Sequence, residues 1–309
     1  MKICVMTATL DGAPRLQRSW DSRAAWNFIG GGAGTGLLLA AAAALPAGWP
    51  YFPAGALGIA LIGFGLSMVW LEIGRPFRAL NVFFHPQTSW MSREALLALP
   101  LLALAGIATL ADQSFVPLPL QMRLLVTPLA SAAAALGLAF LYCQARILKA
   151  SHGVPAWREP SLQWVIIVTG ITEGLGLMLF LSFFVGSPPA WAIPTSLASL
   201  IARAGAWEYY RHRLNPRVPA PAVAALSRIS LPVHLLGHAL PALLLLVSLV
   251  APMPLVPAAV AGLAMVVAGA WLKFAVVTRA AFTQGFSIPF MPVRGRASTA
   301  AAADVRPGQ

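Results

Sequence analysis

Charged residues are scarce in this chain. Of its 309 residues only 10% are charged, 59% are hydrophobic and the mean hydropathy is +0.77, whereas soluble proteins carry about 25% charged residues. The composition therefore excludes an ordinary soluble protein and predicts one embedded in a lipid bilayer. Lys and Arg outnumber Asp and Glu by 21 to 9, but they are spread over short polar segments, so we expect no nucleic-acid partner.

Residues that bind redox metals are also rare. Cys4 and Cys143 are the two cysteines; they form no CxxC pair and cannot supply the four ligands of an iron–sulfur cluster. His234 and His238 lie four residues apart in one hydrophobic run and would share one helix face. They cannot bind one haem from both sides, and a polar contact between helices is the simpler interpretation. We therefore expect no haem, no iron–sulfur cluster and no metal site in this chain.

Long hydrophobic runs dominate what is present. A membrane-spanning helix needs about 20 mostly apolar residues, and eight runs satisfy this. They cover residues 26–45, 54–72, 94–111, 124–144, 162–185, 190–209, 229–250 and 255–278. The predicted fold is an all-α bundle of eight transmembrane helices over residues 24–280. Polar tails at 1–23 and 281–309 flank it, and the first tail lacks the apolar core of a cleavable signal peptide.

Basic residues lie mainly on one side of this predicted bundle. Eighteen of the 21 fall in the two tails and in the loops after the second, fourth and sixth runs. The loops of the other side hold only Arg123, while Arg203 and Lys273 lie inside runs. Because short cytoplasmic loops are enriched in Lys and Arg, we expect a bacterial inner (cytoplasmic) membrane protein with both termini in the cytoplasm.

Two patterns inside the runs are open to more than one interpretation. Residues 30–36 read GGGAGTG, which does not fit GxGxxG; the four-residue spacing of its glycines favours close helix packing, and the alternative is a flat surface for a planar ligand. Glu173, Arg203 and Lys273 are ionisable residues inside runs and are expected to face the bundle interior. Structural pairing and a proton path are both compatible with them.

One polar segment, residues 71–95, joins the second and third runs and holds charges of both signs. Its sequence is LEIGRPFRALNVFFHPQTSWMSREA, with Glu72, Arg75, Arg78, Arg93 and Glu94. Such a cluster at the end of membrane spans is a functional-site hypothesis; the alternative is a solvated loop that sets topology.

This segment resembles the membrane-anchor subunit of dimethyl sulfoxide reductase and the wider NrfD and polysulfide-reductase anchor group. The resemblance is carried by Gly74, Pro76, Arg78, Ala79, Asn81, Ser89 and Glu94. ARILKASHGVPAWREP (145–160) is a second match and VTRAAFTQGF (277–286) a weaker third. Glu72 stands where the dimethyl sulfoxide enzyme's anchor has His. The family's last helix carries a Glu shortly before its Arg, whereas here Lys273 lies six residues before Arg279.

The resemblance implies an anchor that exchanges electrons between an iron–sulfur subunit and the quinone pool (ubiquinone or menaquinone), with a molybdopterin subunit as the catalytic partner. The implied quinone site comprises Glu72, Arg75, Arg78, Asn81, Trp90, Ser92, Arg93 and Glu94. Arg side chains would donate to the quinone oxygens, Glu side chains would relay protons, and Trp90 would form a wall. No catalytic residue is expected in the chain itself.

Because the matched segment lies on the basic side, the resemblance favours a cytoplasm-facing, sulfite-dehydrogenase-like complex that reduces quinone. A secondary transporter with a site at Glu173, Arg203 and Lys273 is the competing hypothesis, although no internal repeat is evident. An inert tether, whose partner performs all electron transfer, is the third.

Overall fold

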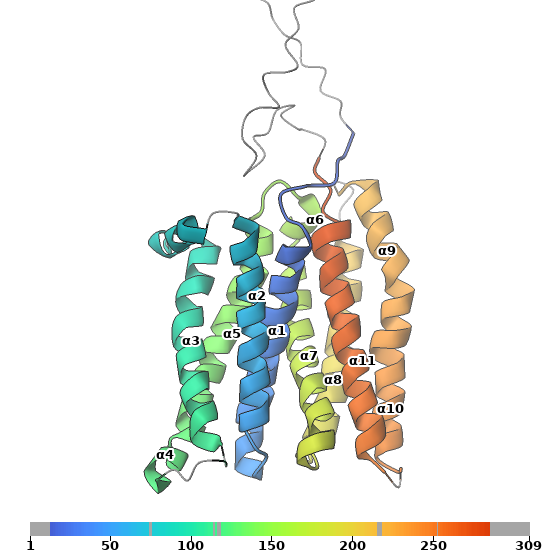
Figure 1. The fold of residues 1–309 in the computed structure, drawn as a ribbon. Coiled ribbons are helices and arrows are strands. Elements are labelled where there is room, and N and C mark those ends of the chain that lie inside the picture. The colour runs from blue at the N-terminus through green and yellow to red at the C-terminus, as the bar shows by residue number, and fades with distance from the viewer. Residues whose placement is uncertain are drawn as a thin grey trace, which may run out of the picture.

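The computed structural model describes residues 13–73, 76–113, 115, 119–214, 218–251 and 253–284. Over these residues the chain folds into long helices that lie side by side, with their axes roughly parallel or antiparallel to one another (Figure 1). The β-structure within this described part is one isolated bridge between Leu16 and Phe282. The predicted all-α class is therefore confirmed.

Seven helical segments of the described chain are long and apolar enough to cross a membrane. They are α1 with η1 (Ser22–Ala44, Leu45–Ala47), α2 (Phe52–Ile73), α3 (Trp90–Asp112), α4 with α5 (Leu120–Leu124, Val126–Ala150), α7 (Leu162–Val185), α9 with η3 and α10 (Ala220–His234, Leu235–Ala239, Leu240–Ser248), and α11 with η4 (Leu255–Phe274, Ala275–Arg279). The structure thus confirms seven of the predicted spans by length and composition.

The remaining predicted span, the sixth at residues 190–209, corresponds to α8 (Ala192–Arg213). This helix runs along the bundle like its neighbours (Figure 1), but it is not among the segments that combine sufficient length with sufficient hydropathy. Its polarity comes from Arg203, Glu208 and the sequence Arg211 to Arg213. A count of eight spans stays a prediction.

The short helices lie in the connections. η1 (Leu45–Ala47) follows α1 at one end of the bundle, whereas η2 (Pro76–Phe84) and α6 (Pro155–Arg158) lie at the other. We call this second end, which also carries residues 13–21 and 280–284, the basic end. There the two described chain ends pair, because Gln17 N–H donates to Ala281 O at 2.9 Å and Thr283 N–H donates to Arg15 O at 2.8 Å.

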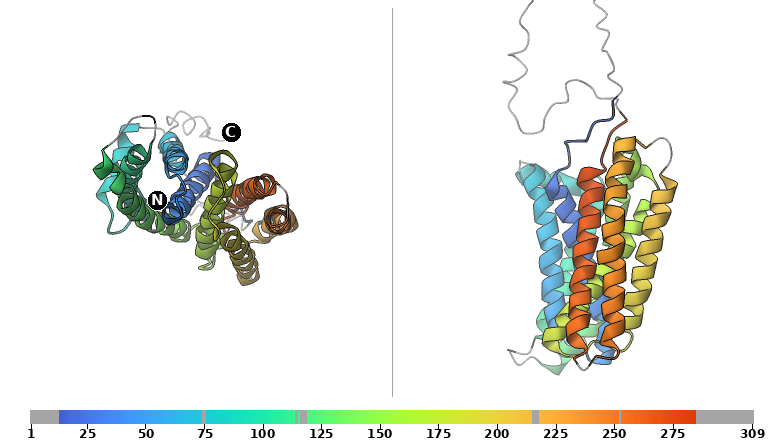
Figure 2. Two further views of the ribbon diagram at one scale, coloured as in Figure 1. Left: turned by 90° about the horizontal axis from the view of Figure 1, so that it is seen from below. Right: turned by 90° about the vertical axis from the view of Figure 1, so that its right-hand side faces the viewer.

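Helices α1 and α7 form the centre of the bundle. In the most hydrophobic stretch of α1, 78% of the residues are buried, and in α7 67%, compared with 28–44% in the other spans. α1 packs on α2, α5 and α7, and α7 packs on α1, α8 and α11. The bundle therefore has a first half (α1, α2, α3, α5) and a second half (α7, α8, α9–α10, α11) that meet along these two helices (Figure 2).

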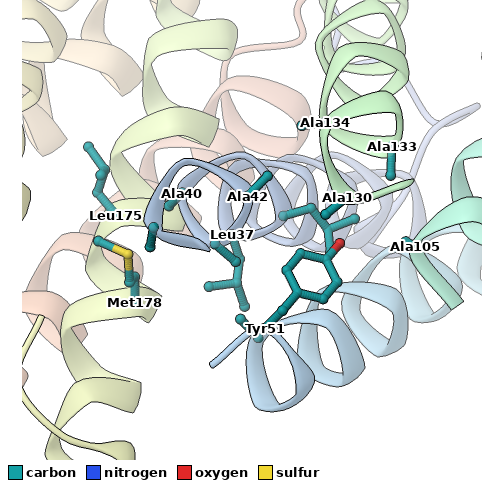
Figure 3. Close-up of a cluster of buried hydrophobic side chains, with 14 of the residues drawn as sticks. Leu37, Ala40, Ala42, Tyr51, Ala105, Ala130, Ala133, Ala134, Leu175 and Met178 are labelled. Atoms are coloured by element: carbon teal, nitrogen blue, oxygen red, sulfur yellow. The ribbon is translucent and has the colours of Figure 1, made fainter. Parts of the chain in front are cut away.

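Small residues let these helices approach closely. A Cβ at Gly34 would lie 2.5 Å from the backbone oxygen of Gly58 on α2, and a Cβ at Gly174 of α7 would overlap the backbone of Gly36. The core beside them is rich in alanine, with Leu37 and Tyr51 filling the larger spaces (Figure 3). The packing interpretation of residues 30–36 is confirmed for these glycines.

Candidate functional site

The polar segment connects α2 to α3 at the basic end. Ser89 caps α3: its backbone is extended (φ −109°, ψ 122°), and its Oγ accepts from the N–H of Ser92 at 3.3 Å. Such a cap satisfies a backbone donor that otherwise has no intrahelical partner. α3 therefore begins at Trp90, four residues before the predicted span, so that Trp90, Ser92 and Arg93 belong to its first turn.

Glu94 follows this turn and is buried, as is Ser92 within it. It is 4% exposed, and its Oε1 accepts from Asn27 Nδ2 of α1 at 3.5 Å. Gln144 of α5, which is fully buried, donates from Nε2 to the backbone oxygen of Asn27 at 3.2 Å. Three helices thus contribute to one polar cluster, which we call the amide cluster: Asn27, Glu94 and Gln144.

The amide cluster has unused hydrogen-bonding capacity. Asn27 Oδ1 and Gln144 Oε1 are buried and have no hydrogen-bond partner among the described residues, although buried polar atoms are usually paired. Glu94 also forms no ion pair with any residue that the structure describes. Its carboxyl group therefore contacts a neutral amide rather than a cation.

A second group, the aromatic–guanidinium cluster, consists of Trp90, Arg93, Tyr142 and Arg146. The guanidinium carbons of Arg93 and Arg146 lie 4.1 and 4.6 Å from the centre of the Trp90 ring. Tyr142 meets Trp90 edge to face, with ring centres 5.7 Å apart. Trp90 and Glu94 are four residues apart, so they share a helix face, and this cluster lies beside the amide cluster.

The two arginines are oriented by neutral groups. Arg93 donates from Nε to Pro86 O at 2.7 Å and from a terminal nitrogen to Gln87 O at 2.8 Å. Arg146 donates weakly to the Tyr142 hydroxyl at 3.5 Å, and its Nε is buried with no partner in the described chain. Both guanidinium groups keep donors for an anionic or carbonyl oxygen.

The other predicted site residues differ in how deeply they are buried. Glu72 is half-buried at the end of α2, close enough to Arg23 for their charges to interact. Arg78 and Asn81 are exposed in η2, because three residues per turn put both on one solvent-facing row. Ser92 is buried beneath its cap, and Arg75 lies outside the described residues. Arg78 and Asn81 therefore face solvent, whereas Glu94 is buried.

Sequence reasoning missed Asn27, Tyr142, Gln144 and Arg146 as site residues. The prediction within the spans rested on ionisable side chains and left out neutral amides. Asn27 and Gln144 lie near the basic ends of the first and fourth hydrophobic runs, so uncharged polar residues at that depth are the signal that would have found them.

The ionisable residues of the second half form a separate buried group. Lys273 Nζ lies 2.5 Å from Glu173 Oε2 and donates to Phe28 O at 3.0 Å. Arg203 donates from Nε to His238 Nε2 at 3.2 Å and also to the backbone oxygens of Met265 and Gly237. The expectation that Glu173, Arg203 and Lys273 face the bundle interior is confirmed, with Glu173 and Lys273 paired, and the histidines make the predicted contact between helices. Within the described chain, no three His, Cys, Asp or Glu residues are grouped to hold a metal ion.

Comparison of the sequence with known proteins places this chain in a family. Residues 53–226, from α2 to α9, match the family model described as DMSO reductase anchor subunit (DmsC). The chain is also 30% identical over 185 residues to one of the sulfite dehydrogenase subunits of Allochromatium vinosum, an alignment that covers 55% of this chain and 56% of the relative. The chain thus spans about half the length of this curated relative. Because the family match covers more than half of the chain, the protein belongs to the DMSO reductase anchor subunit (DmsC) family.

Proposed function

We propose that this protein is the quinone-interacting anchor of a three-subunit oxidoreductase complex in a bacterial inner membrane. In this role it passes electrons between an iron–sulfur subunit and the quinone pool, while catalysis takes place on a molybdopterin subunit. The observation that carries the proposal is the buried Glu94, held by amides whose oxygens lack partners and placed beside a tryptophan and two arginines.

The chemistry of a quinone head group fits these side chains. A quinone takes up two electrons and two protons and is planar, with two carbonyl oxygens that accept hydrogen bonds. The Trp90 ring supplies an apolar wall, and the guanidinium groups of Arg93 and Arg146 supply donors that stabilise developing negative charge. Glu94, whose carboxyl group Asn27 orients, gives up or receives the proton at the quinone oxygen.

The charge distribution supports one orientation of the complex in the membrane. The proposed site lies at the basic end, and the excess of Lys and Arg at this end supports a cytoplasmic location. An iron–sulfur subunit that delivers electrons to this site docks there, and the catalytic subunit then lies in the cytoplasm. The name of the curated relative supports a sulfite-oxidising partner, with electrons flowing to ubiquinone or menaquinone.

The variant Glu94→Gln in the purified intact complex tests the site. Loss of a general acid or base slows proton transfer by roughly 100-fold or more, so we expect quinone-linked turnover to fall by about that factor while turnover with a soluble dye is retained. Glu159→Gln is the matched control, because Glu159 also lies at the basic end but contacts Ser161 and Arg213. Equal loss of both activities, or of neither, would contradict the quinone role.

The orientation has its own test. In spheroplasts with an intact inner membrane, externally added protease should leave the iron–sulfur and catalytic subunits uncut, because both lie inside. Lysed spheroplasts serve as the control in which both are cut. Cleavage of these subunits from the periplasmic side would overturn the cytoplasmic assignment.

A further inference from the structure

The connection between α2 and α3 contains a helix that lies across the ends of the spans. η2 (Pro76–Phe84) is a 3₁₀ helix of nine residues, although such helices rarely exceed three or four residues. Figure 1 draws it in teal at the upper left, at the outer edge of the first half, with its axis across those of α2 and α3. It packs mainly on these two helices. Because α2 and α3 are membrane spans, a helix in this orientation lies along the membrane surface.

The side chains of η2 form three rows with different chemistry. In a 3₁₀ helix, residues three apart in the sequence align, which gives the rows Ala79 with Val82, Phe77 with Leu80 and Phe83, and Arg78 with Asn81 and Phe84. The first row is half-buried, so it is the one that meets the bundle. In the second, apolar row, Phe77 is 89% exposed and Leu80 52%. The third row begins with the exposed polar residues Arg78 and Asn81. The helix therefore presents an apolar row and a polar row side by side, both away from the bundle.

Exposed apolar side chains also mark the ends of the two spans that η2 connects. Trp70 and Leu71 are exposed in the last turn of α2, and Leu96 and Leu99 are exposed near the start of α3. Large apolar side chains gathered on a surface indicate that something other than water covers them. On a membrane span the cover is lipid, and here it reaches the level at which η2 begins.

Arg78 adds a charge beside the apolar row. It forms no ion pair with any residue that the structure describes. A guanidinium group binds phosphate oxygens through its forked donors, and basic residues next to a membrane attract anionic lipid headgroups. Arg78 is thus placed to contact a lipid phosphate while the neighbouring row contacts acyl chains.

We propose that η2 is an interfacial membrane helix. Its apolar row inserts among the acyl chains of the leaflet at the basic end, and Arg78 binds the phosphate of an anionic phospholipid. Helices that lie in the membrane interface have this arrangement, with the apolar side in the boundary between headgroups and acyl chains and basic residues on the polar side. The inference goes beyond the proposed function and stands whether or not the chain binds quinone.

The iron–sulfur subunit is the rival occupant of the apolar row. Two observations favour lipid: η2 lies at the outer edge of the first half rather than over the centre of the bundle (Figure 2), and its apolar row lies at the level of the exposed ends of α2 and α3. Insertion also holds the connection to the first turn of α3, which carries Trp90, at the depth of the headgroups.

Photocrosslinking in the intact complex identifies what covers the apolar row. The photocrosslinker p-benzoylphenylalanine replaces Phe77, and the complex is reconstituted in liposomes of equal parts phosphatidylglycerol and phosphatidylcholine. After irradiation, we expect mass spectrometry of this chain to show an adduct with a phospholipid. The same photocrosslinker at His152, which is exposed between α5 and α6 at the basic end, is the control and should give no phospholipid adduct.

The variant Arg78→Gln, combined with the photocrosslinker at position 77, tests the headgroup contact. One arginine at an anionic surface favours the anionic lipid roughly fivefold, so phosphatidylglycerol adducts should outnumber phosphatidylcholine adducts by that factor. Most of this preference should be lost in Arg78→Gln. Arg158→Gln, an exposed substitution in α6, is the control and should keep the preference.

The results distinguish the two occupants. A cross-link from position 77 to the iron–sulfur subunit, or the absence of a phospholipid adduct, would overturn the insertion of η2. Equal adducts of the two lipids while Arg78 is present would overturn its contact with an anionic headgroup. If the complex with the photocrosslinker at position 77 does not assemble, the photocrosslinker at Leu80 in the same row gives the same test and should form the same adduct.

Discussion

The two halves of the bundle each bury one glutamate next to the same turn of α1, but they surround it differently. Glu94 in the first half contacts neutral amides and lies beside the half-exposed Trp90 and Arg93. Glu173 in the second half contacts the ammonium of Lys273 and is fully buried. Under the proposed function the first carboxyl group contacts a diffusing quinone, whereas the second forms an ion pair in the interior.

The largest difference between the halves should appear in stability. Glu173→Leu leaves Lys273 buried without its partner, and breaking a buried pair in this way costs about 3–5 kcal/mol. Glu94→Leu removes a group that has no ion pair with a described residue and should cost clearly less. Thermal unfolding of the purified protein in detergent measures both.

The double variant Glu173→Leu/Lys273→Met is the control for that comparison. It removes both charges together and should recover most of the stability that Glu173→Leu loses, because replacing a whole buried pair by apolar residues is often nearly neutral. Equal costs for the Glu94 and Glu173 single variants would contradict the contrast between the halves.

The interface between α1 and α7, the seam where the two halves meet, gives the next largest effect on stability. A Cβ at Gly174 would overlap the backbone of Gly36, so Gly174→Ala should force α1 and α7 apart at a cost of about 1–3 kcal/mol. Gly63→Ala is the matched control in α2, because nothing lies within 4 Å of the added Cβ. It should leave stability unchanged or raise it by up to about 1 kcal/mol. A neutral Gly174→Ala would show that the seam is loosely packed.

Hydropathy was sufficient to predict where the helices lie, but not which side chains of different helices contact one another. The run at 162–185 coincides with α7 at both ends, whereas α3 begins four residues early because the Ser89 cap is a local hydrogen bond that hydropathy does not detect. The contact between Asn27 and Gln144 joins residues 117 positions apart. Neither neutral amide stands out in a single sequence, so Glu94 was predicted as a site residue while the amides around it were not.

A smaller effect is expected from Arg146, one of the cluster residues that were not predicted as site residues from the sequence. Arg146→Gln removes a cation–π contact of about 0.5–2 kcal/mol with Trp90 and one donor to the quinone. We expect the KM for quinone to rise severalfold, with dye turnover unchanged. Arg158→Gln, an exposed substitution in α6, is the control. An unchanged KM in Arg146→Gln would remove this residue from the site.

The smallest effect on stability should come from Asp21, which precedes α1 in the sequence. Asp21 caps α1 by accepting from the N–H of Arg23 at 2.7 Å, and the hydrogen bond from the Arg23 side chain lowers the pKa of Asp21. Asp21→Ala should cost about 0.5–1 kcal/mol. Because the folded-state pKa is the lower one, this stabilisation is complete above the ordinary pKa of an aspartate and is lost as the pH falls through the lowered value. The melting temperatures of variant and wild type should therefore converge in acid.

Photolabelling of the intact complex with an azidoquinone, followed by peptide mapping, tests the central claim most directly. The account predicts label on the first turn of α3 and the end of α5, around Trp90, Glu94 and Arg146, and competition by excess quinone. The opposite end of the bundle offers a rival location, a cavity of about 590 Å³ lined in part by Trp49 and Asp112. Competed label there, with none near Glu94, would contradict the account.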